Sequence, residues 1–299
     1  MSLAKGDAVA VVAPASQLPG ADRGLLAAGA DLLASWGLEV RVAVEQGHHF
    51  YLAGTDTDRA RHLTDMLVDP EIRAIFCMRG GYGSPRLLRH LDPHLRPSSR
   101  VLVGFSDVTA LHAYVARHYP GVSSIHGPNI ATHQLLDETP AAEANRASLR
   151  DALFEDYHLA QPVEFLRGGR AEGDLFGGCL TMLATLIGTP YLPSLAGTLL
   201  FLEDSAESPY RIDRMLTQLR DSGTLTGVTG IVFGRMHQCV DPYNDVRAVI
   251  ADVLADLPVP VAFGLDSGHG PGNLSLPLGA PAELDSAAGV FRTARTDPS

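Results

Sequence analysis

Cysteine is scarce in this 299-residue sequence, and the three that occur, Cys77, Cys179 and Cys239, lie far apart. An odd number without paired spacing excludes a disulfide framework and the ligand pairs of a zinc site. A protein without structural disulfides suits a reducing compartment, so the sequence predicts a cytoplasmic location.

Positive charge is also in short supply. The chain has 23 Lys and Arg against 34 Asp and Glu, which gives a formal net charge of −11, and its basic residues form no cluster. Non-specific binding to nucleic acid depends on clustered Lys and Arg. We therefore expect no nucleic-acid partner and attribute the negative charge to solubility.

Long hydrophobic runs are missing as well. The chain begins MSLAKGDAVAVVAPAS, and the apolar run of residues 8–13 is too short for a signal peptide and far too short for a membrane-spanning helix. This start supports neither export nor a membrane partner.

What remains is the composition of an ordinary globular enzyme, with 45% hydrophobic and 19% charged residues. A chain of this length exceeds what one core usually holds, so we expect two domains with the site in the cleft between them. A polar, helical stretch predicts a linker at residues 136–161. It would join an N-terminal α/β domain at residues 1–135 to a C-terminal domain at residues 162–299.

Hydrophobic strands alternate with helical patterns along the chain. In the first half we predict strands at 8–13, 38–44, 74–78 and 101–104, and helices at 25–36, 56–68, 86–91, 106–119 and 140–153. Strands that are apolar throughout favour a parallel sheet covered on both faces. In the second half we predict helices at 177–187, 209–222 and 245–254, strands at 198–203, 230–234 and 259–264, and several short strands from residue 272 onward.

Ser106, in the sequence GFSD, lies where a predicted buried strand passes into a helix. This position exposes the hydroxyl at the carboxyl edge of a sheet, beside the free N–H groups of a helix N-terminus. A serine that only caps the helix would occupy the same place. Val108 stands where the G-x-S-x-G nucleophile elbow has its second glycine, which argues against an ordinary α/β-hydrolase.

Two further stretches offer the other parts of an acyl-transfer site. Glu203 ends the apolar strand TLLFLE, and His269 lies in the glycine-rich loop GHGPG. A serine nucleophile needs an imidazole to take its proton and a carboxylate to orient that imidazole. Asp204 and Glu207 are alternative carboxylates, and any of the twelve histidines can be a surface or packing residue. The spacing alone therefore does not identify the base.

Two other motifs have more than one interpretation. RGGYG, at residues 79–83, follows a strand, and its glycines either let the backbone donate N–H groups to an anion or form a plain tight turn. In HQCVD, the side chains of His237, Cys239 and Asp241 would share one face of a strand, as metal ligands can. No second cluster completes that set, so we predict no metal site.

Taken in order, seven stretches closely resemble the LD-carboxypeptidases of the S66 serine peptidase family. They are FYLAGTDTDRARHLTDMLVDPEIRAIFCMRGGYGSPRLLRHLD, LVGFSDVTALH, HGP at 126–128, GGCLTMLATLIGTPYLP, LFLEDSAESPYRIDRMLTQL, GIVFGRM and GHGPGNLSLPLG. The resemblance extends from about residue 9 to about residue 285, which is nearly the whole chain.

The resemblance implies a cytoplasmic enzyme of peptidoglycan recycling that removes the terminal D-alanine from a murein tetrapeptide. It implies Ser106 as nucleophile, His269 as base and Glu203 as the residue that orients the histidine. The oxyanion donors would be the backbone N–H groups of Asp107 and Gly81, and no cofactor or metal is required. It also implies a glutamine-amidotransferase-like N-terminal domain, a smaller C-terminal domain with a β-rich core, and a homodimer.

A carboxypeptidase must also hold the free carboxylate of its substrate. Arg79 and Arg211 are the candidates, because a guanidinium matches a carboxylate with two parallel hydrogen bonds. The rival activity within the same family is hydrolysis of a peptidyl-nucleotide toxin, which would call for aromatic side chains stacking on a base. The single tryptophan, Trp36, falls in an N-terminal helix instead. A more distant rival is a binding module without catalytic activity.

Overall fold

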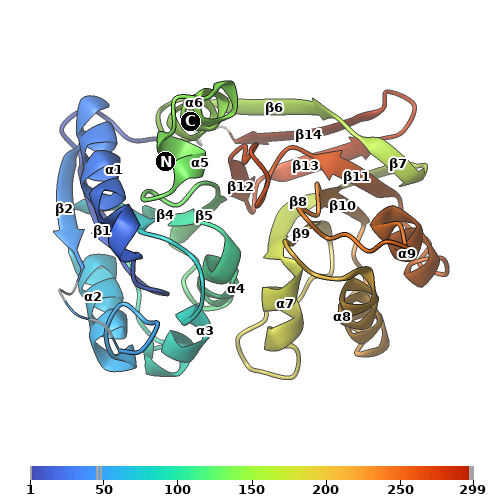
Figure 1. Ribbon diagram of the computed structural model, residues 1–299, viewed down its shortest axis with the longest axis horizontal. Helices are drawn as coiled ribbons and strands as arrows, with labels where there is room; N and C mark the ends of the chain where they lie inside the picture. Colours follow the sequence, from blue (N-terminus) through green and yellow to red (C-terminus); the bar gives the residue numbers. More distant parts are fainter. Residues whose placement is uncertain (1, 45–46, 48, 296–299) are drawn as a thin grey trace.

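The computed structural model describes residues 2–44, 47 and 49–295. In this part of the chain the strands form two sheets, one of six and one of eight strands, that lie side by side (Figure 1). None of the helices in these ranges combines the length and the apolar character that crossing a membrane would demand.

The first sheet is built mainly from parallel strands of the N-terminal half. Its order is β12-β5-β4-β3-β1-β2, with β1 (Ala8–Val12), β2 (Glu39–Ala43), β3 (Ile72–Cys77), β4 (Arg100–Gly104), β5 (Val122–His126) and β12 (Leu276–Leu278). Strands β1 to β5 are parallel, and only β12 pairs antiparallel. The buried strands β1 and β4 are apolar along nearly their whole length, as expected for a parallel sheet covered on both faces.

The helices of this half are α1 (Arg23–Ser35), α2 (Asp56–Val68), α3 (Ser84–Leu87) and α4 (Thr109–His118), followed by α5 (His133–Leu136) and α6 (Pro140–Phe154). The predicted alternation of strands and helices is therefore confirmed through residue 119. The strand β5 was not predicted, because its sequence VSSIH has only two strongly apolar residues.

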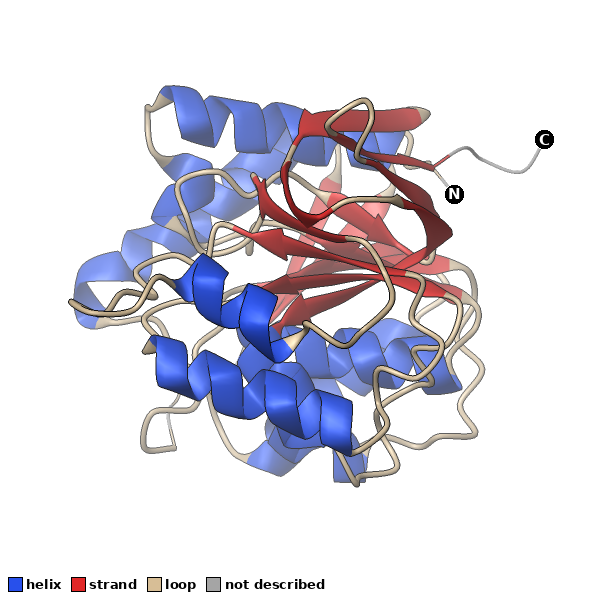
Figure 2. Ribbon diagram, turned by 90° about the vertical axis from the view of Figure 1, so that its right-hand side faces the viewer, coloured by secondary structure: helices blue, strands red, loops and turns tan. Residues whose placement is uncertain are grey.

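The second sheet combines four parallel strands with antiparallel edges. Its order is β6-β14-β13-β8-β9-β10-β11-β7, with β6 (Tyr157–Pro162), β7 (Glu164–Arg167), β8 (Arg170–Cys179), β9 (Thr198–Glu203), β10 (Gly230–Gly234), β11 (Val261–Leu265), β13 (Pro281–Asp285) and β14 (Val290–Arg295). The helices α7 (Leu180–Leu186), α8 (Pro209–Asp221) and α9 (Val246–Val253) lie on one side of β8 to β11. Figure 2 shows this arrangement from the side of the second sheet.

One predicted helix begins later than its pattern suggested. Residues 177–179 belong to β8 rather than to a helix, and Gly177 and Gly178 have φ of +145° and +144°. A Cβ atom on Gly177 would lie 1.8 Å from the carbonyl oxygen of Phe201 on the neighbouring strand. Only glycine fits this approach, so the helix prediction was wrong for these three residues.

Strand pairs and a common hydrophobic cluster join the N-terminal and C-terminal halves of the chain. The strand β12 of the C-terminal half pairs with β5 in the first sheet, and β6, at residues 157–162, pairs with β14 in the second. One hydrophobic cluster contains side chains of α4, such as Leu111, together with side chains of α7 and β9, such as Leu183 and Leu200. The division at residues 135 and 161 stays a prediction.

Candidate active site

Ser106 lies directly after β4, at the start of a short 3₁₀ turn that leads into α4. Its φ of +66° is a left-handed conformation that residues other than glycine rarely adopt. Such strain is kept only where the surrounding structure enforces it, and it is common at functional sites. Here the partly exposed hydroxyl faces His269.

The structure brings the hydroxyl of Ser106 together with the imidazole of His269 and the carboxylate of Glu203. The Nε2 atom of His269 lies 2.8 Å from the Oγ atom of Ser106. Its Nδ1 atom lies 2.6 Å from Oε2 of Glu203, which also accepts the backbone N–H of His269 at 3.1 Å. These three contacts have the geometry of a nucleophile, a base and an orienting carboxylate.

The rival carboxylates have other partners. The carboxylate of Asp204 accepts the backbone N–H and the hydroxyl of Thr181, both at 2.8 Å, and the backbone N–H of Ser205. Burial raises the pKa of Asp204, and the neighbouring charge of Glu203 raises it further. Glu207 forms an ion pair with Arg211 at 3.6 Å. Glu203 is therefore the carboxylate that faces His269.

The electrostatics of the pair favour a charged carboxylate next to the imidazole. Burial works to raise the pKa of Glu203, but the charge and hydrogen bonds of His269 outweigh it and hold this pKa below its usual range. Burial works to lower the pKa of His269, and the charge and hydrogen bond of Glu203 raise it above the ordinary value. An imidazole in this setting is a stronger base than one that is only buried.

The backbone at residue 268 has to come close to Glu203 for this contact to form. Gly268 has a φ of +114°, and a Cβ atom there would lie 2.5 Å from Oε2 of Glu203. Any larger residue would push the carboxylate away from the imidazole. The glycine-rich sequence around His269 is thus explained by the approach of two segments.

Buried amide side chains hold the loop that carries His269. The amide nitrogen of Gln134 donates to the carbonyl oxygens of Gly268 and Gly270, at 2.7 and 2.5 Å. The backbone N–H of Gly268 donates to the side chain of Asn273 at 3.0 Å, and the backbone N–H of Asn273 donates to Oδ1 of Asn145 at 2.7 Å. We call Gln134, Asn145 and Asn273 the amide clamp. Sequence analysis did not predict this clamp, because Asn145 lies within the predicted linker and Gln134 lies just before it.

Replacing Asn145 by alanine should lower the free energy of unfolding by about 3 kcal/mol, because buried partners lose their hydrogen bonds. The side chain is fully buried and donates to the carbonyl oxygens of Gln134 and Pro271, both at 2.9 Å. Urea denaturation followed by circular dichroism measures the change. Arg150→Ala, at an exposed position of the same helix, is the control and should change stability by less than about 0.5 kcal/mol. Equal stability of both variants would contradict the importance of the clamp.

The RGGYG loop lies next to Ser106. Gly81 has a φ of +105°, and the loop is held by Ser16, whose hydroxyl accepts the backbone N–H of Tyr82 at 3.0 Å. Arg79 donates to the carbonyl oxygen of Gln17 at 2.9 Å. The loop therefore has contacts that fix its backbone beside Ser106.

Asp107 is placed by its side chain as well as by its position at the helix start. It is 1% exposed, and its carboxylate accepts the backbone N–H of Ser84 at 2.7 Å. Burial raises the pKa of Asp107. With the Asp107 side chain held by Ser84, its backbone N–H lies in the first turn of the helix, where N–H groups have no partner within the helix.

A cavity of about 440 Å³ lies over these groups. Ser106 and His269 line it together with Arg79, Gly81, Asp107, Asn129, Asp204 and Glu207. Arg211 is not among the described residues that line the cavity; it lies on α8, and its side chain is 55% exposed. Of the two arginines proposed to hold a carboxylate, only Arg79 borders this space.

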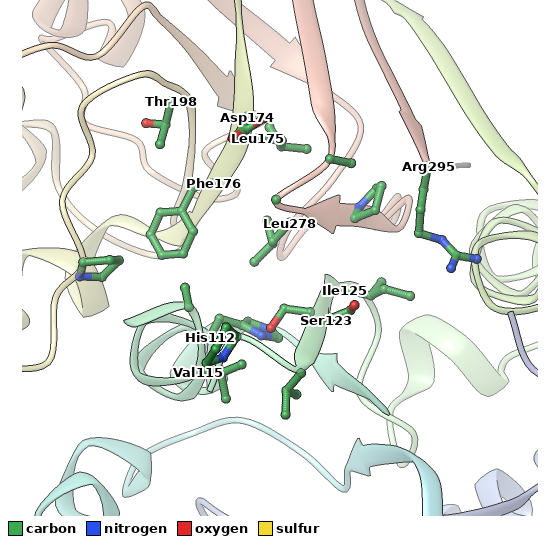
Figure 3. A pocket seen from close by; sticks show the side chains of 18 of the residues that line it. His112, Val115, Ser123, Ile125, Asp174, Leu175, Phe176, Thr198, Leu278 and Arg295 are labelled. Atoms are coloured by element: carbon green, nitrogen blue, oxygen red, sulfur yellow. The ribbon is translucent and has the colours of Figure 1, made fainter. Parts of the chain in front are cut away.

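The larger cavity, of about 690 Å³, is elsewhere (Figure 3). Figure 3 shows Phe176 and Leu278 on one side of it and His112 and Ile125 on the other. Ser106, Glu203 and His269 are not among the described residues that line it. Size alone would favour this cavity, whereas the hydrogen-bonded Ser106 and His269 line the smaller one.

The strand on which the HQCVD metal hypothesis depended is not formed. His237 makes one isolated bridge to Ser205, and Gln238 has a φ of +56°, which is incompatible with an extended strand. Across residues 2–44, 47 and 49–295, no three or more His, Cys, Asp or Glu side chains gather as a metal site requires.

Comparison with known proteins identifies the family. Residues 9–127 match the family model described as the LD-carboxypeptidase N-terminal domain, and residues 172–284 match that of the LD-carboxypeptidase C-terminal domain. A putative carboxypeptidase from Streptomyces coelicolor is 43% identical, over 97% of this chain and 94% of that protein. The murein tetrapeptide carboxypeptidase of Pseudomonas aeruginosa is 36% identical, over 80% of this chain and 81% of that protein.

Solved structures agree with the sequence matches. The muramoyltetrapeptide carboxypeptidase of Oxalobacter formigenes superposes with a TM-score of 0.84 at 30% identity, covering 98% of this chain and all of that one. The microcin C7 self-immunity protein MccF of Escherichia coli is more distant, at 26% identity over 79% of this chain and 78% of that protein. From the matches of both domains and the full-length relatives, the chain belongs to the S66 family of LD-carboxypeptidases.

Proposed function

We propose that this protein is a serine-type LD-carboxypeptidase that releases the terminal D-alanine from murein tetrapeptides. The observation that carries the proposal is the hydrogen-bonded chain from Ser106 through His269 to Glu203, with contacts of 2.8 and 2.6 Å, on the wall of a cavity. The names of the relatives from P. aeruginosa and O. formigenes supply the substrate.

In the first half of the proposed reaction, the Oγ atom of Ser106 attacks the carbonyl carbon of the bond before D-alanine. Nε2 of His269 takes the hydroxyl proton, and the charge of Glu203 stabilises the imidazolium that forms. The same proton then passes to the nitrogen of D-alanine as its bond to the carbonyl carbon breaks. Ser106 is left esterified to the shortened peptide.

In the second half, His269 takes a proton from water as the water oxygen attacks the ester. The ester bond breaks, and the proton returns from His269 to Oγ of Ser106. The backbone N–H groups of Asp107 and Gly81 are the proposed donors to the oxyanion in both halves. Every step uses groups of this chain, the peptide and water, and none calls for a metal ion or a cofactor.

Arg79 is the proposed partner of the D-alanine carboxylate. It lines the cavity, and its Nη1 atom is held by the carbonyl oxygen of Gln17. Its guanidinium has further N–H groups to offer to a carboxylate. Arg211 stays a second candidate, although it lies outside the cavity and pairs with Glu207.

The alternative activity is the hydrolysis of a peptidyl-nucleotide, as the relation to MccF suggests. A nucleotide site would be favoured by aromatic side chains on which a base can stack. Trp36 caps the end of α1, and its ring packs edge-on against Phe154 at 6.4 Å between ring centroids, so it is partly buried against the core. The murein peptide is the better supported substrate.

We further propose that the enzyme acts in the cytoplasm, in peptidoglycan recycling, and as a homodimer. The cysteines at 77, 179 and 239 are free and buried, which agrees with a reducing compartment. The dimer rests on the family resemblance alone.

The test of this function is the release of D-alanine from purified murein peptides. We expect release from the tetrapeptide and none from the pentapeptide, in which the bond to be cut joins two D-residues. A coupled D-amino acid oxidase assay measures the product, and EDTA should leave the rate unchanged. Absence of release from the tetrapeptide, with the protein folded, would reject the proposed substrate.

A further inference from the structure

His126 occupies a central place behind the hydrogen-bonded chain. It is the last residue of β5 and is fully buried, with Gly104 of β4 on one side and Leu276 of β12 on the other. Its ring packs edge-on against Phe201 at 5.0 Å and against Phe105 at 5.9 Å between ring centroids. Phe105 precedes the nucleophile, so His126 contacts the surroundings of Ser106.

Phe201 also connects His126 to Glu203. Phe201 and Glu203 lie on β9 with one residue between them, so their side chains point to the same face of the sheet. The ring of His126 packs against Phe201, and His126 and Glu203 influence each other electrostatically. The Phe105 ring completes the arrangement, because it also packs against His269 at 5.0 Å.

Both His126 and Glu203 have polar atoms that are buried without a hydrogen-bond partner. Among the described residues, neither ring nitrogen of His126 has a partner, and Oε1 of Glu203 has none either. The other carboxylate oxygen, Oε2, accepts both contacts from His269. A buried carboxylate oxygen and a buried N–H that stay unpaired each cost free energy, so a shared partner stabilises both.

We propose that His126 is a positioning residue, whose ring N–H binds Oε1 of Glu203 through one bridging water. The carboxylate is then held from both sides, by His269 on Oε2 and by His126 on Oε1. This inference rests on the proposed function, because it assigns a role in the reaction to a residue that does not touch the substrate. A buried water with two polar partners is a common structural element.

The charges around the pair are consistent with a neutral His126. Burial lowers the pKa of His126 to about 3; Glu203 works against this shift, and His112 on α4 and His269 add to it. A neutral imidazole has one N–H, which is what a carboxylate oxygen requires. The charged or titratable groups that act on Glu203 are His269 from the loop and His126 from β5, and Asp204 follows it directly after the end of β9.

Removing the N–H group of His126 should change the pKa of His269, the proposed base, through its effect on Glu203. A carboxylate that loses one hydrogen bond holds the imidazolium of His269 more strongly, so the pKa of His269 rises. The fraction of His269 that is neutral, and so able to take the proton of Ser106, then falls at a given pH. A purely structural role of His126 would lower the rate at every pH without moving this titration.

The experiment compares His126→Phe, His126→Gln and the native protein by the rate at which a fluorophosphonate probe acylates Ser106. We expect the Phe variant to react about tenfold more slowly. The acidic limb of its pH–rate profile, where the rate falls as the pH drops, should move to higher pH. His126→Gln supplies an N–H again and should recover most of the rate and the native limb. His158→Phe, on the exposed side of β6, is the control and should match the native protein.

An unchanged acidic limb in His126→Phe, or no recovery in His126→Gln, would overturn the inference. The probe reports on Ser106 whatever the natural substrate is, so absence of D-alanine release affects the proposed function and not this test. A crystal structure of the native protein decides the matter even if the variants do not fold. We expect one water bound to both Oε1 of Glu203 and the His126 ring, and a structure with no such shared water would overturn the inference.

Discussion

Replacing Ser106 by alanine is expected to lower kcat for D-alanine release by at least about 10⁴-fold. The variant keeps His269 and Glu203 in place but has no oxygen to form the ester, and the reaction has no second nucleophile of comparable position. The oxygen that this variant lacks, Oγ of Ser106, lies 2.8 Å from Nε2 of His269. The measurement is a steady-state assay of D-alanine release from the tetrapeptide, with circular dichroism to establish that the variant is folded.

Ser106→Gly separates chemistry from stability in the same experiment. Glycine also lacks the hydroxyl, yet it adopts the φ of +66° at this position with less strain than alanine. We expect the glycine variant to be as inactive as the alanine variant and to unfold at the same or a higher temperature. Ser35→Ala, at the end of α1, is the control with native activity. Full turnover by Ser106→Ala would remove this serine from the mechanism.

The positions of the three site residues could be predicted because each lies in a stretch with its own local signal. A buried strand followed by a helix predicted the exposed edge for Ser106, and an acidic residue after five apolar or neutral ones marked the strand end at Glu203. The glycines around His269 indicated a loop that can approach another segment. Their convergence depended on the family resemblance, since no spacing rule joins residues so far apart.

The support of the site was not predictable from local patterns. The amide clamp joins residues 134 and 145 to residue 273, and polar side chains in a linker region look the same whether they face solvent or a buried loop. The left-handed backbone of Ser106 has no sequence signal either, because serine is not a residue that favours a positive φ. Such features arise from tertiary contacts that outweigh local preference.

The β strands that were missed have a similar explanation. The strand β8 has two glycines before its last residue, and their close approach to β9 replaces the apolar pattern by which buried strands are found. Strand β12 is one of the short strands predicted from residue 272 onward, but its pairing in the sheet of the other half is revealed only by the folded chain. Glycines within a strand and pairing between distant segments therefore limited the prediction of the two sheets.

Replacing Glu203 by glutamine should lower kcat by about 10⁴-fold, although the two side chains have nearly the same size. Nδ1 of His269 lies 2.6 Å from Oε2 of Glu203, so the carboxylate accepts a hydrogen bond from the Nδ1–H group and leaves Nε2 free to take the proton of Ser106. A glutamine amide can donate to Nδ1 instead, which would place the ring proton on Nε2. The imidazole would then be unable to act as a base toward the serine. Glu172→Gln, at an exposed position of β8, is the control.

The pH dependence of the same variant tests the electrostatic part of this argument. In the native protein the charge of Glu203 raises the pKa of His269, so kcat/KM should fall as the pH drops through a value above the ordinary 6.5. Without that charge burial dominates and the pKa of His269 decreases, so the acidic limb of the residual activity should move to lower pH. Steady-state rates in overlapping buffers from about pH 4.5 to 9 measure both limbs. A limb that stays in place or moves to higher pH in Glu203→Gln would show that this carboxylate does not control the base.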